Sequence, residues 1–274
     1  MKKCRFLLLS VFCFVVLGIC SQTPEKGVSK ALAAQRKANI SNVKYDLTFN
    51  IPVGQREKVS GLAVISFNLK KKVDVVLDFQ GKTDGEIYVE KKKRKVSTKN
   101  DHIIIPAKYL KPGPVTLTLM FTSQNDALER NSDYLLTRLA TNSISSLFPC
   151  FDQPDIKAKY NTQLHAPEGW KTIVCDESKP LPSHLYTFLA GNFQEKTSTR
   201  EGYHIRILYR ETDPIKIQQL EKIIDEMAAK LERFPRREGV TLRKALVFDG
   251  TIAPSVEERH YFDALIPASK LFGL

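Results

Sequence analysis

Hydrophobic and polar residues alternate over four stretches in the first half of the chain. The apolar members of the first stretch are Val43, Tyr45, Leu47, Phe49 and Ile51, and the same period of two returns over 63–69, 73–79 and 115–121. This alternation is typical of a strand with one buried face and one face in water. Turn residues such as Gly81 and the run 111–114 separate the stretches, and no helical period interrupts them. The pattern predicts a mainly β fold, either an antiparallel sandwich or a curved sheet.

The second half of the chain begins with more strand-like stretches and then changes period. Strands are expected over 159–165, 171–175, 185–193 and 203–210. Beyond them Asp213 can cap a helix that starts at Pro214, because apolar residues follow at spacings of three and four as far as Leu231. A shorter helix is expected over Ser29–Ala38. The expected divisions are 1–20, a signal peptide; 21–42, a linker and short helix; 43–212, a β-domain; and 213–274, a helix and a truncated or degenerate start of a further domain.

The first twenty residues have the layout of a secretory signal peptide. Lys2, Lys3 and Arg5 precede an apolar stretch over Phe6–Leu17, and small residues flank a cleavage point after Cys20. The apolar stretch is short for a membrane span. An uncleaved membrane anchor and a lipoprotein signal ending at Cys20 are the alternatives. We therefore expect an exported protein, which is periplasmic, on the cell surface or secreted, with no stable membrane span after cleavage.

Composition and charge exclude few classes of function. Apolar residues make up 42% of the chain and charged residues 26%, which is ordinary for a globular protein, and the formal net charge is +12. The basic runs over 70–72 and 91–95 each lie between expected strands, and aromatic residues do not interleave with them as they do in single-strand binding grooves. We expect solvated turns at both runs and no nucleic-acid partner. A smaller expectation is that they bind acidic polymers or anionic lipid.

Motifs that carry chemistry are absent from the sequence. It contains no H-E-x-x-H, C-x-x-C or G-x-S-x-G and no phosphate-binding glycine loop, and its five histidines are far apart. Removal of residues 1–20 leaves only Cys150 and Cys175. These two could pair, but two separate buried thiols are favoured. No catalytic residue, no metal ligand and no cofactor is therefore assigned to this chain.

One segment is distinctive enough to suggest a family. Residues 147–154 read LFPCFDQP, which resembles the FPCFDEP signature of the aminopeptidase N family of zinc metallopeptidases. Four flanking segments resemble that family in the same order and spacing: 43–47, 134–137, 164–170 and 185–193. The resemblance extends over about 29–235.

The resemblance implies a fold and a function. It implies that 43–212 is the N-terminal β-domain of that family, a saddle of antiparallel strands, followed by the first helix of a thermolysin-like catalytic domain. The expected function is that of the N-terminal domain of a secreted zinc aminopeptidase, which removes N-terminal residues from peptides and holds zinc in its full-length form. The fragment is expected to be inactive, because the family's G-x-M-E-N loop is missing from 250–262 and its zinc motif is missing altogether. The alternative is a non-enzymatic exported β-sandwich module that binds peptide, glycan or protein.

The resemblance also assigns residues. The signature residues are expected to be structural: Phe148, Pro149, Cys150, Phe151, Asp152, Gln153 and Pro154. In physical terms the two phenylalanines are apolar anchors, the prolines fix turns, and Asp152 can accept hydrogen bonds from backbone amides. Thr137 and Arg138 are expected to form a wall of the substrate cleft, with Arg138 where many family members have a substrate-contacting glutamine.

The signal-peptide layout predicts that the exported protein begins near Ser21. Intact-mass measurement of the exported protein should show the loss of residues 1–20. A mass that retains Met1, or that includes a lipid on Cys20, would contradict cleavage at this point.

Overall fold

The computed structural model describes residues 24–124, 126–137, 144–174, 180–200, 203–210, 212, 214, 217–218 and 243–248. Several features expected from the sequence lie outside these residues: the signal peptide over 1–20, Arg138, Cys175, the helix cap at Asp213, most of the helix that follows it, and the segment 250–262.

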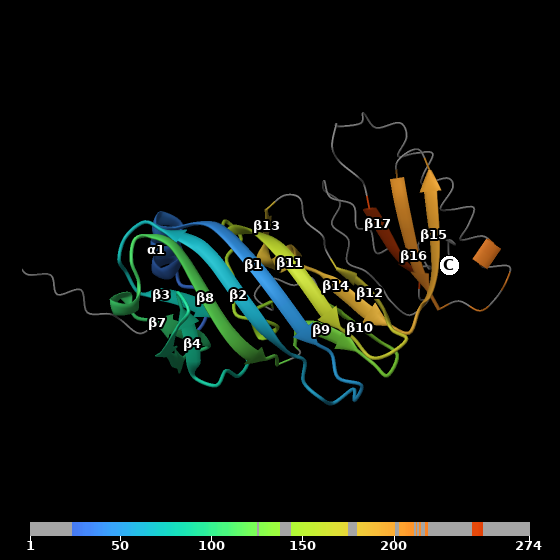
Figure 1. The fold of residues 1–274 in the computed structure, drawn as a ribbon, viewed down its shortest axis with the longest axis horizontal. Coiled ribbons are helices and arrows are strands. Elements are labelled where there is room, and N and C mark those ends of the chain that lie inside the picture. Colours follow the sequence, from blue (N-terminus) through green and yellow to red (C-terminus); the bar gives the residue numbers. More distant parts are fainter. Residues whose placement is uncertain are drawn as a thin grey trace, which may run out of the picture.

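A seven-stranded sheet is the largest unit, with strand order β13-β11-β1-β2-β8-β4-β5 (Figure 1). Its long central strands are β1 (Ile40–Asn50), β2 (Ser60–Leu69) and β8 (Gly113–Thr122). The sheet is extended on one side by β11 (Lys157–His165) and β13 (Leu181–Pro182), and on the other by the hairpin of β4 (Glu86–Val89) and β5 (Lys92–Lys95). Buried residues recur at every second position of β2 and β8, so one face of this sheet packs on the core.

Two smaller sheets complete this core. One contains β12 (Lys171–Val174), β14 (Phe188–Gly191), β10 (Tyr134–Thr137) and β9 (Leu128–Arg130), in that order. The other contains β3 (Val75–Asp78), β7 (His102–Ile105) and β6 (Ser97–Lys99). Every residue of β3, β10 and β14 is buried, because these strands have protein on both faces. One main cluster takes buried side chains from all three sheets, and a second, smaller cluster contains Tyr134, Leu136, Leu189, Phe193 and Leu208.

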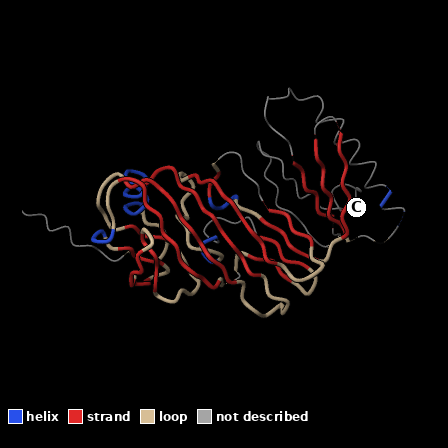
Figure 2. Tube along the Cα trace, viewed as in Figure 1, coloured by secondary structure: helices blue, strands red, loops and turns tan. Residues whose placement is uncertain are grey.

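Helical structure is sparse, and strands make up most of the described chain (Figure 2). The helix α1 (Lys30–Asn39) runs directly into β1, and single 3-10 turns occur at η1 (Ala107–Tyr109), η2 (Ile144–Ser146) and η3 (Ser183–Leu185). A further three-stranded sheet is formed by β15 (Gln194–Arg200), β16 (Tyr203–Tyr209) and β17 (Arg243–Phe248). Among the described residues, no helix is both long and apolar enough to cross a bilayer.

The mainly β, sandwich-like fold class predicted from the alternation is confirmed, with two differences in detail. First, β11 pairs with β1 in parallel, and β17 pairs with β16 in parallel, so the strands are not all antiparallel. Alternation shows which side chains face the core but says nothing of strand direction, which depends on the connection. Second, the strand expected over 185–193 is wrong at its start, because η3 includes Leu185 and β14 begins only at Phe188. The domain boundaries stay a prediction.

The two basic runs differ in structure. Residues 70–72 form an exposed connection after β2, as expected for a solvated turn. At the start of the second run, Glu90 and Lys91 form a tight turn, and their φ angles of 49° and 64° are those of a type I′ hairpin turn. The expectation of a turn over the whole of 91–95 is wrong, because Lys92–Lys95 forms the edge strand β5. Lysines on an edge strand discourage pairing with a second chain.

Aromatic rings fill the space between the large sheet and the segment over 147–154. The Phe148 ring lies 5.2 Å from the Tyr186 ring and 5.7 Å from the Tyr45 ring, measured between centroids, and Phe151 meets Phe67 edge-on at 5.4 Å. Edge-to-face contacts of this kind add to the burial of a large apolar surface.

Replacement of Phe151 by alanine should lower the free energy of unfolding by about 3–5 kcal/mol, because the ring is fully buried and its removal leaves a cavity. Denaturant unfolding of both proteins measures this difference. Tyr88→Ala is the matched control, since Tyr88 is 45% exposed on the outer face of β4, and we expect it to cost less than about 1 kcal/mol. Equal costs for the two substitutions would contradict the anchoring role of Phe151.

Candidate functional site

The signature segment crosses the interior of the protein. Residues 147–153 are all buried, whereas Pro154 is exposed. The segment is attached to the end of β3 by two backbone hydrogen bonds: Asp78 N–H donates to the Cys150 carbonyl at 2.7 Å, and Cys150 N–H donates to the Asp78 carbonyl at 3.1 Å. This bridge places the segment against the one acidic side chain of β3.

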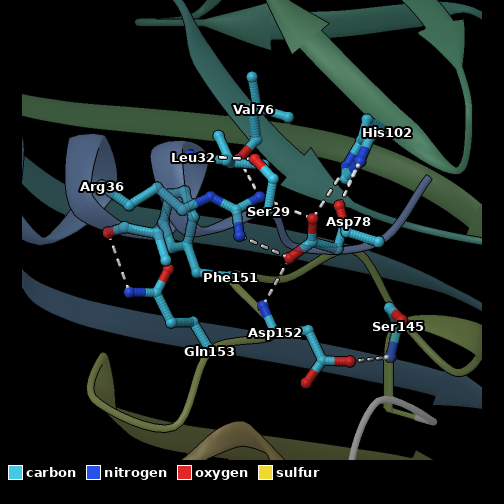
Figure 3. Close-up of polar contacts among 12 residues, drawn as sticks. Ser29, Leu32, Arg36, Val76, Asp78, His102, Ser145, Phe151, Asp152 and Gln153 are labelled. Carbon is cyan, nitrogen blue, oxygen red and sulfur yellow. Dashed lines mark hydrogen bonds and ion pairs between the residues drawn. The ribbon is translucent and has the colours of Figure 1, made fainter. Parts of the chain in front are cut away.

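The Asp78 carboxylate is the centre of a buried polar cluster (Figure 3). Arg36 of α1 binds it with two hydrogen bonds, Nη2 to Oδ1 at 2.6 Å and Nη1 to Oδ2 at 2.8 Å, and its Nη2 also donates to the Val76 carbonyl at 2.9 Å. The Asp152 amide donates to Oδ2 at 2.8 Å, and His102 Nδ1 lies 2.9 Å from Oδ1. A forked guanidinium–carboxylate pair is one of the strongest and most directional polar contacts in proteins.

Sequence and pairing explain how these groups meet. Asp78 and His102 are register partners in the antiparallel pair β3–β7. Ser29 caps α1 by accepting a hydrogen bond from Leu32 N–H at 3.2 Å, and Arg36, the one buried side chain of this helix, then reaches β3. The Arg36 guanidinium also lies over the Phe151 ring at 5.7 Å. The buried contact of α1 with β3 is therefore made by a charged side chain and not by a row of apolar side chains.

Burial and partners act in opposite directions on Asp78. Burial alone raises the pKa of a carboxyl group, but the contact with His102, the charge and hydrogen bonds of Arg36, and the Asp152 amide together outweigh it. The pKa of Asp78 is consequently lowered, and the group is an anion at neutral pH.

The pKa of Asp152 shifts in the opposite direction. Burial raises the pKa of its carboxyl group, and the neighbouring Asp78 charge adds to this increase. Two hydrogen bonds work against the increase, from Ser183 Oγ to Oδ1 at 3.0 Å and from Ser145 N–H to Oδ2 at 3.3 Å. The net pKa is raised. The Asp152 amide thus bonds to Asp78, and the Asp152 carboxyl group accepts hydrogen bonds that fix the turns η2 and η3.

The other signature residues bind neighbouring elements. Phe151 N–H donates to Tyr45 Oη at 2.9 Å, and Gln153 Nε2 donates to the Ala33 carbonyl of α1 at 3.1 Å. The Cys150 thiol is free and fully buried, and burial with the nearby carboxylates raises its pKa well above the usual value. A thiol in this state is protonated and is a poor nucleophile. These contacts fix the signature segment to β1 and α1.

Of the two residues expected at a cleft wall, the structure describes Thr137. Thr137 is the last residue of β10 and is buried, with its Oγ1 accepting a hydrogen bond from Phe188 N–H at 3.0 Å. Its hydroxyl is therefore engaged by the neighbouring strand β14. Arg138 lies outside the described residues, and the cleft wall stays a prediction.

Sequence reasoning did not single out Arg36, Asp78 or His102. A signal was available for one of them, since Asp78 interrupts the apolar run from Val75 to Phe79. An acidic residue in a buried strand needs a cationic partner. The sequence does not say that this partner comes from a helix some forty residues earlier.

The described residues do not form a zinc site. No three side chains of the His, Cys, Asp or Glu type gather there into a set able to hold a metal ion. Two described histidines have other partners, His102 at Asp78 and His165 at Asn50.

Known proteins share this fold. The structure of Legionella pneumophila aminopeptidase A superposes with a TM-score of 0.61 at 18% identity over 77% of this chain and 29% of that protein. An M1 zinc metallopeptidase from Deinococcus radiodurans gives 0.58 at 12% identity over 79% and 58%, and yeast LTA4 hydrolase gives 0.59 at 15% identity over 78% and 39%. This chain has a fold found in M1 zinc metallopeptidases. The resemblance drawn from the signature segment is thereby confirmed.

Sequence comparison gives weaker support. A leucine aminopeptidase 2-2 from Meyerozyma guilliermondii is 25% identical over 179 residues, which cover 55% of this chain and 28% of that protein. No family model matches the sequence. The chain thus spans less than a third of the length of this curated relative.

Replacement of Asp78 by asparagine should lower the free energy of unfolding by about 3–5 kcal/mol at neutral pH, because it leaves the buried Arg36 guanidinium without its counter-charge. The matched control is Asp155→Asn, which removes the charge that meets Lys37 at the surface with an N–O distance of 3.1 Å but keeps an oxygen to accept the 2.6 Å hydrogen bond from Gln153 Nε2. We expect this control to cost less than about 1 kcal/mol. Denaturant titration measures both, and similar losses would show that the Asp78 cluster contributes no more than a surface pair.

Proposed function

We propose that this chain is the N-terminal part of an exported zinc aminopeptidase and forms one wall of its peptide-binding cleft. The observation that carries the proposal is the signature segment, which the structure places in the core of a fold shared with M1 zinc metallopeptidases. The expected signal peptide over 1–20 supports export.

The described residues suit a rigid platform better than a flexible binding module. The signature segment is bonded to α1, β1, β3 and the turns η2 and η3. Thr137 is fixed to β14 in the same region of the core. Groups that orient a substrate must be held to within a fraction of an ångström, which needs such cross-bonded support. We infer that this platform positions residues near 137–138 beside the peptide.

The zinc-dependent chemistry would belong to a region that this chain does not supply. Zinc bound in the complete enzyme would supply an acidified water for peptide hydrolysis. The contribution of the present residues is to bind and orient the peptide and to support the zinc-bearing region. The chain alone is therefore inactive.

Two measurements test this proposal together. The coding DNA beyond codon 274 should encode H-E-x-x-H within about the next hundred codons, in the same or a shifted frame, since the family carries its zinc motif after the first helix of the catalytic domain. The purified 274-residue chain, supplied with zinc, should hydrolyse no aminoacyl chromogenic substrate and retain no stoichiometric metal, because its described residues lack a ligand set.

Each measurement has an outcome that contradicts the proposal. Downstream DNA without a zinc motif in any frame would favour a non-enzymatic module that binds peptide, glycan or protein. Chelator-sensitive turnover by the chain alone would show that metal ligands exist among its own residues.

A further inference from the structure

Five residues before α1, 24–28, form a strap that lies on the turn between β6 and β7. At the surface, Asn100 Nδ2 donates a hydrogen bond to the Pro24 carbonyl at 2.9 Å, and Lys26 Nζ lies 3.0 Å from Asp101 Oδ2. Both contacts are exposed, and exposed contacts of this kind contribute little. The buried contact of the strap is with His102.

The His102 ring joins the strap to the Asp78 cluster. Its Nε2 lies 2.8 Å from the Glu25 carbonyl oxygen and 3.1 Å from that of Gly27, and its Nδ1 lies 2.9 Å from Asp78 Oδ1. Gly27 has a φ of 82°, a conformation that favours glycine, and this turn brings the two strap carbonyls to the same nitrogen. Figure 3 shows the ring directed at Asp78.

Both ring nitrogens therefore face oxygen acceptors. Only the doubly protonated imidazolium presents an N–H to both sides, at hydrogen-bond distance to the strap carbonyls and at ion-pair distance to Asp78, because a neutral ring carries one N–H. When the ring loses a proton, the remaining one stays on Nδ1, because the Asp78 carboxylate, an anion 2.9 Å away, would repel an Nδ1 lone pair more strongly than neutral carbonyls repel the lone pair of Nε2. The Nε2 lone pair then faces the lone pairs of two carbonyl oxygens, which repel it.

We propose that His102 is a proton-operated latch for the strap: the imidazolium holds residues 24–28 against the β6–β7 turn, and loss of its proton releases them. The charged groups that surround the ring are Asp78 from β3 and Arg36 from α1. On β6, Lys99 is the register partner of His102 and is exposed, and Lys26 and Asp101 pair with each other at the surface.

The direction of the response follows from these surroundings. Burial lowers the pKa of His102, but the Asp78 carboxylate and the Glu25 carbonyl more than compensate, so its pKa in the folded protein is raised above the ordinary 6.5. A raised pKa means that the strap contact is complete below pH 6.5 and is lost as the pH rises through the higher, folded-state pKa. Arg36 and Asp78 remain paired throughout, so the rest of the cluster keeps its charges.

Trypsin cleavage after Lys26 reports release of the strap, because the Lys26 side chain is exposed while the backbone of the strap is held. At each pH from 6 to 9, we measure how fast trypsin cleaves the 274-residue chain to give a new terminus at Gly27. This rate is divided by the rate at which trypsin cleaves the same bond in a free peptide spanning 22–31. This ratio removes the pH dependence of trypsin itself. We expect the ratio to rise with pH, by up to about tenfold per pH unit between the two pKa values of His102.

Two variants locate the effect. In His102→Gln, which cannot titrate, the ratio should be the same at every pH. In the matched control His165→Gln, which removes an exposed histidine bonded to Asn50, the rise should remain. A flat ratio in the unsubstituted chain, an unchanged rise in His102→Gln, or loss of the rise in His165→Gln would each overturn the latch.

A direct titration covers the case in which His102→Gln does not fold. The ring signals of His102 in the unsubstituted chain, assigned through the β7 backbone by NMR, should titrate above pH 6.5 together with chemical-shift changes in residues 25–28. A midpoint at or below 6.5, or strap signals that do not follow the ring, would overturn the proposal.

Discussion

The carboxylate of Asp78 is the point on which the arrangement of this protein depends. It is a buried anion, and it receives a guanidinium from α1, an imidazole from β7 and an amide from the signature segment. Removal of a charge from water costs several kcal/mol unless such partners replace the lost hydration. The segments that supply them must therefore fold together, because each would otherwise leave a buried polar group unsatisfied.

A buried ionic cluster of this kind defines position more than it adds stability. Apolar residues of equal volume often stabilise a core as well as a buried ion pair does, but they tolerate small shifts that a forked hydrogen-bond pair does not. In this protein the pair sets the distance between α1 and β3, and the Asp152 amide sets the depth of the signature segment. A platform that orients a substrate benefits from such fixed distances.

Much of the fold could be predicted from the sequence, and the polar cluster could not. The alternation around Tyr45 and Leu117 identifies buried faces, because each residue's own type and spacing carry that information. The aromatic residues of the signature could likewise be assigned to the core. The meeting of Arg36, Asp78 and His102 depends on which strands become neighbours, and that follows from strand order and register. The parallel direction of β11 could not be predicted for the same reason, because it too depends on which strands become neighbours.

The parallel pairing of β1 with β11 has a consequence for the order of folding. Val43 pairs with Ala158, so one edge of β1 has no partner until more than a hundred further residues are present. Loop closure over such a distance costs entropy before any contact compensates for it, and topologies of high contact order fold slowly for this reason. β1, β2 and β8 can associate early, since they pair in the antiparallel order β1-β2-β8. Until β11 is present, this edge of β1 can pair with the strand of another chain, as unpaired strand edges do.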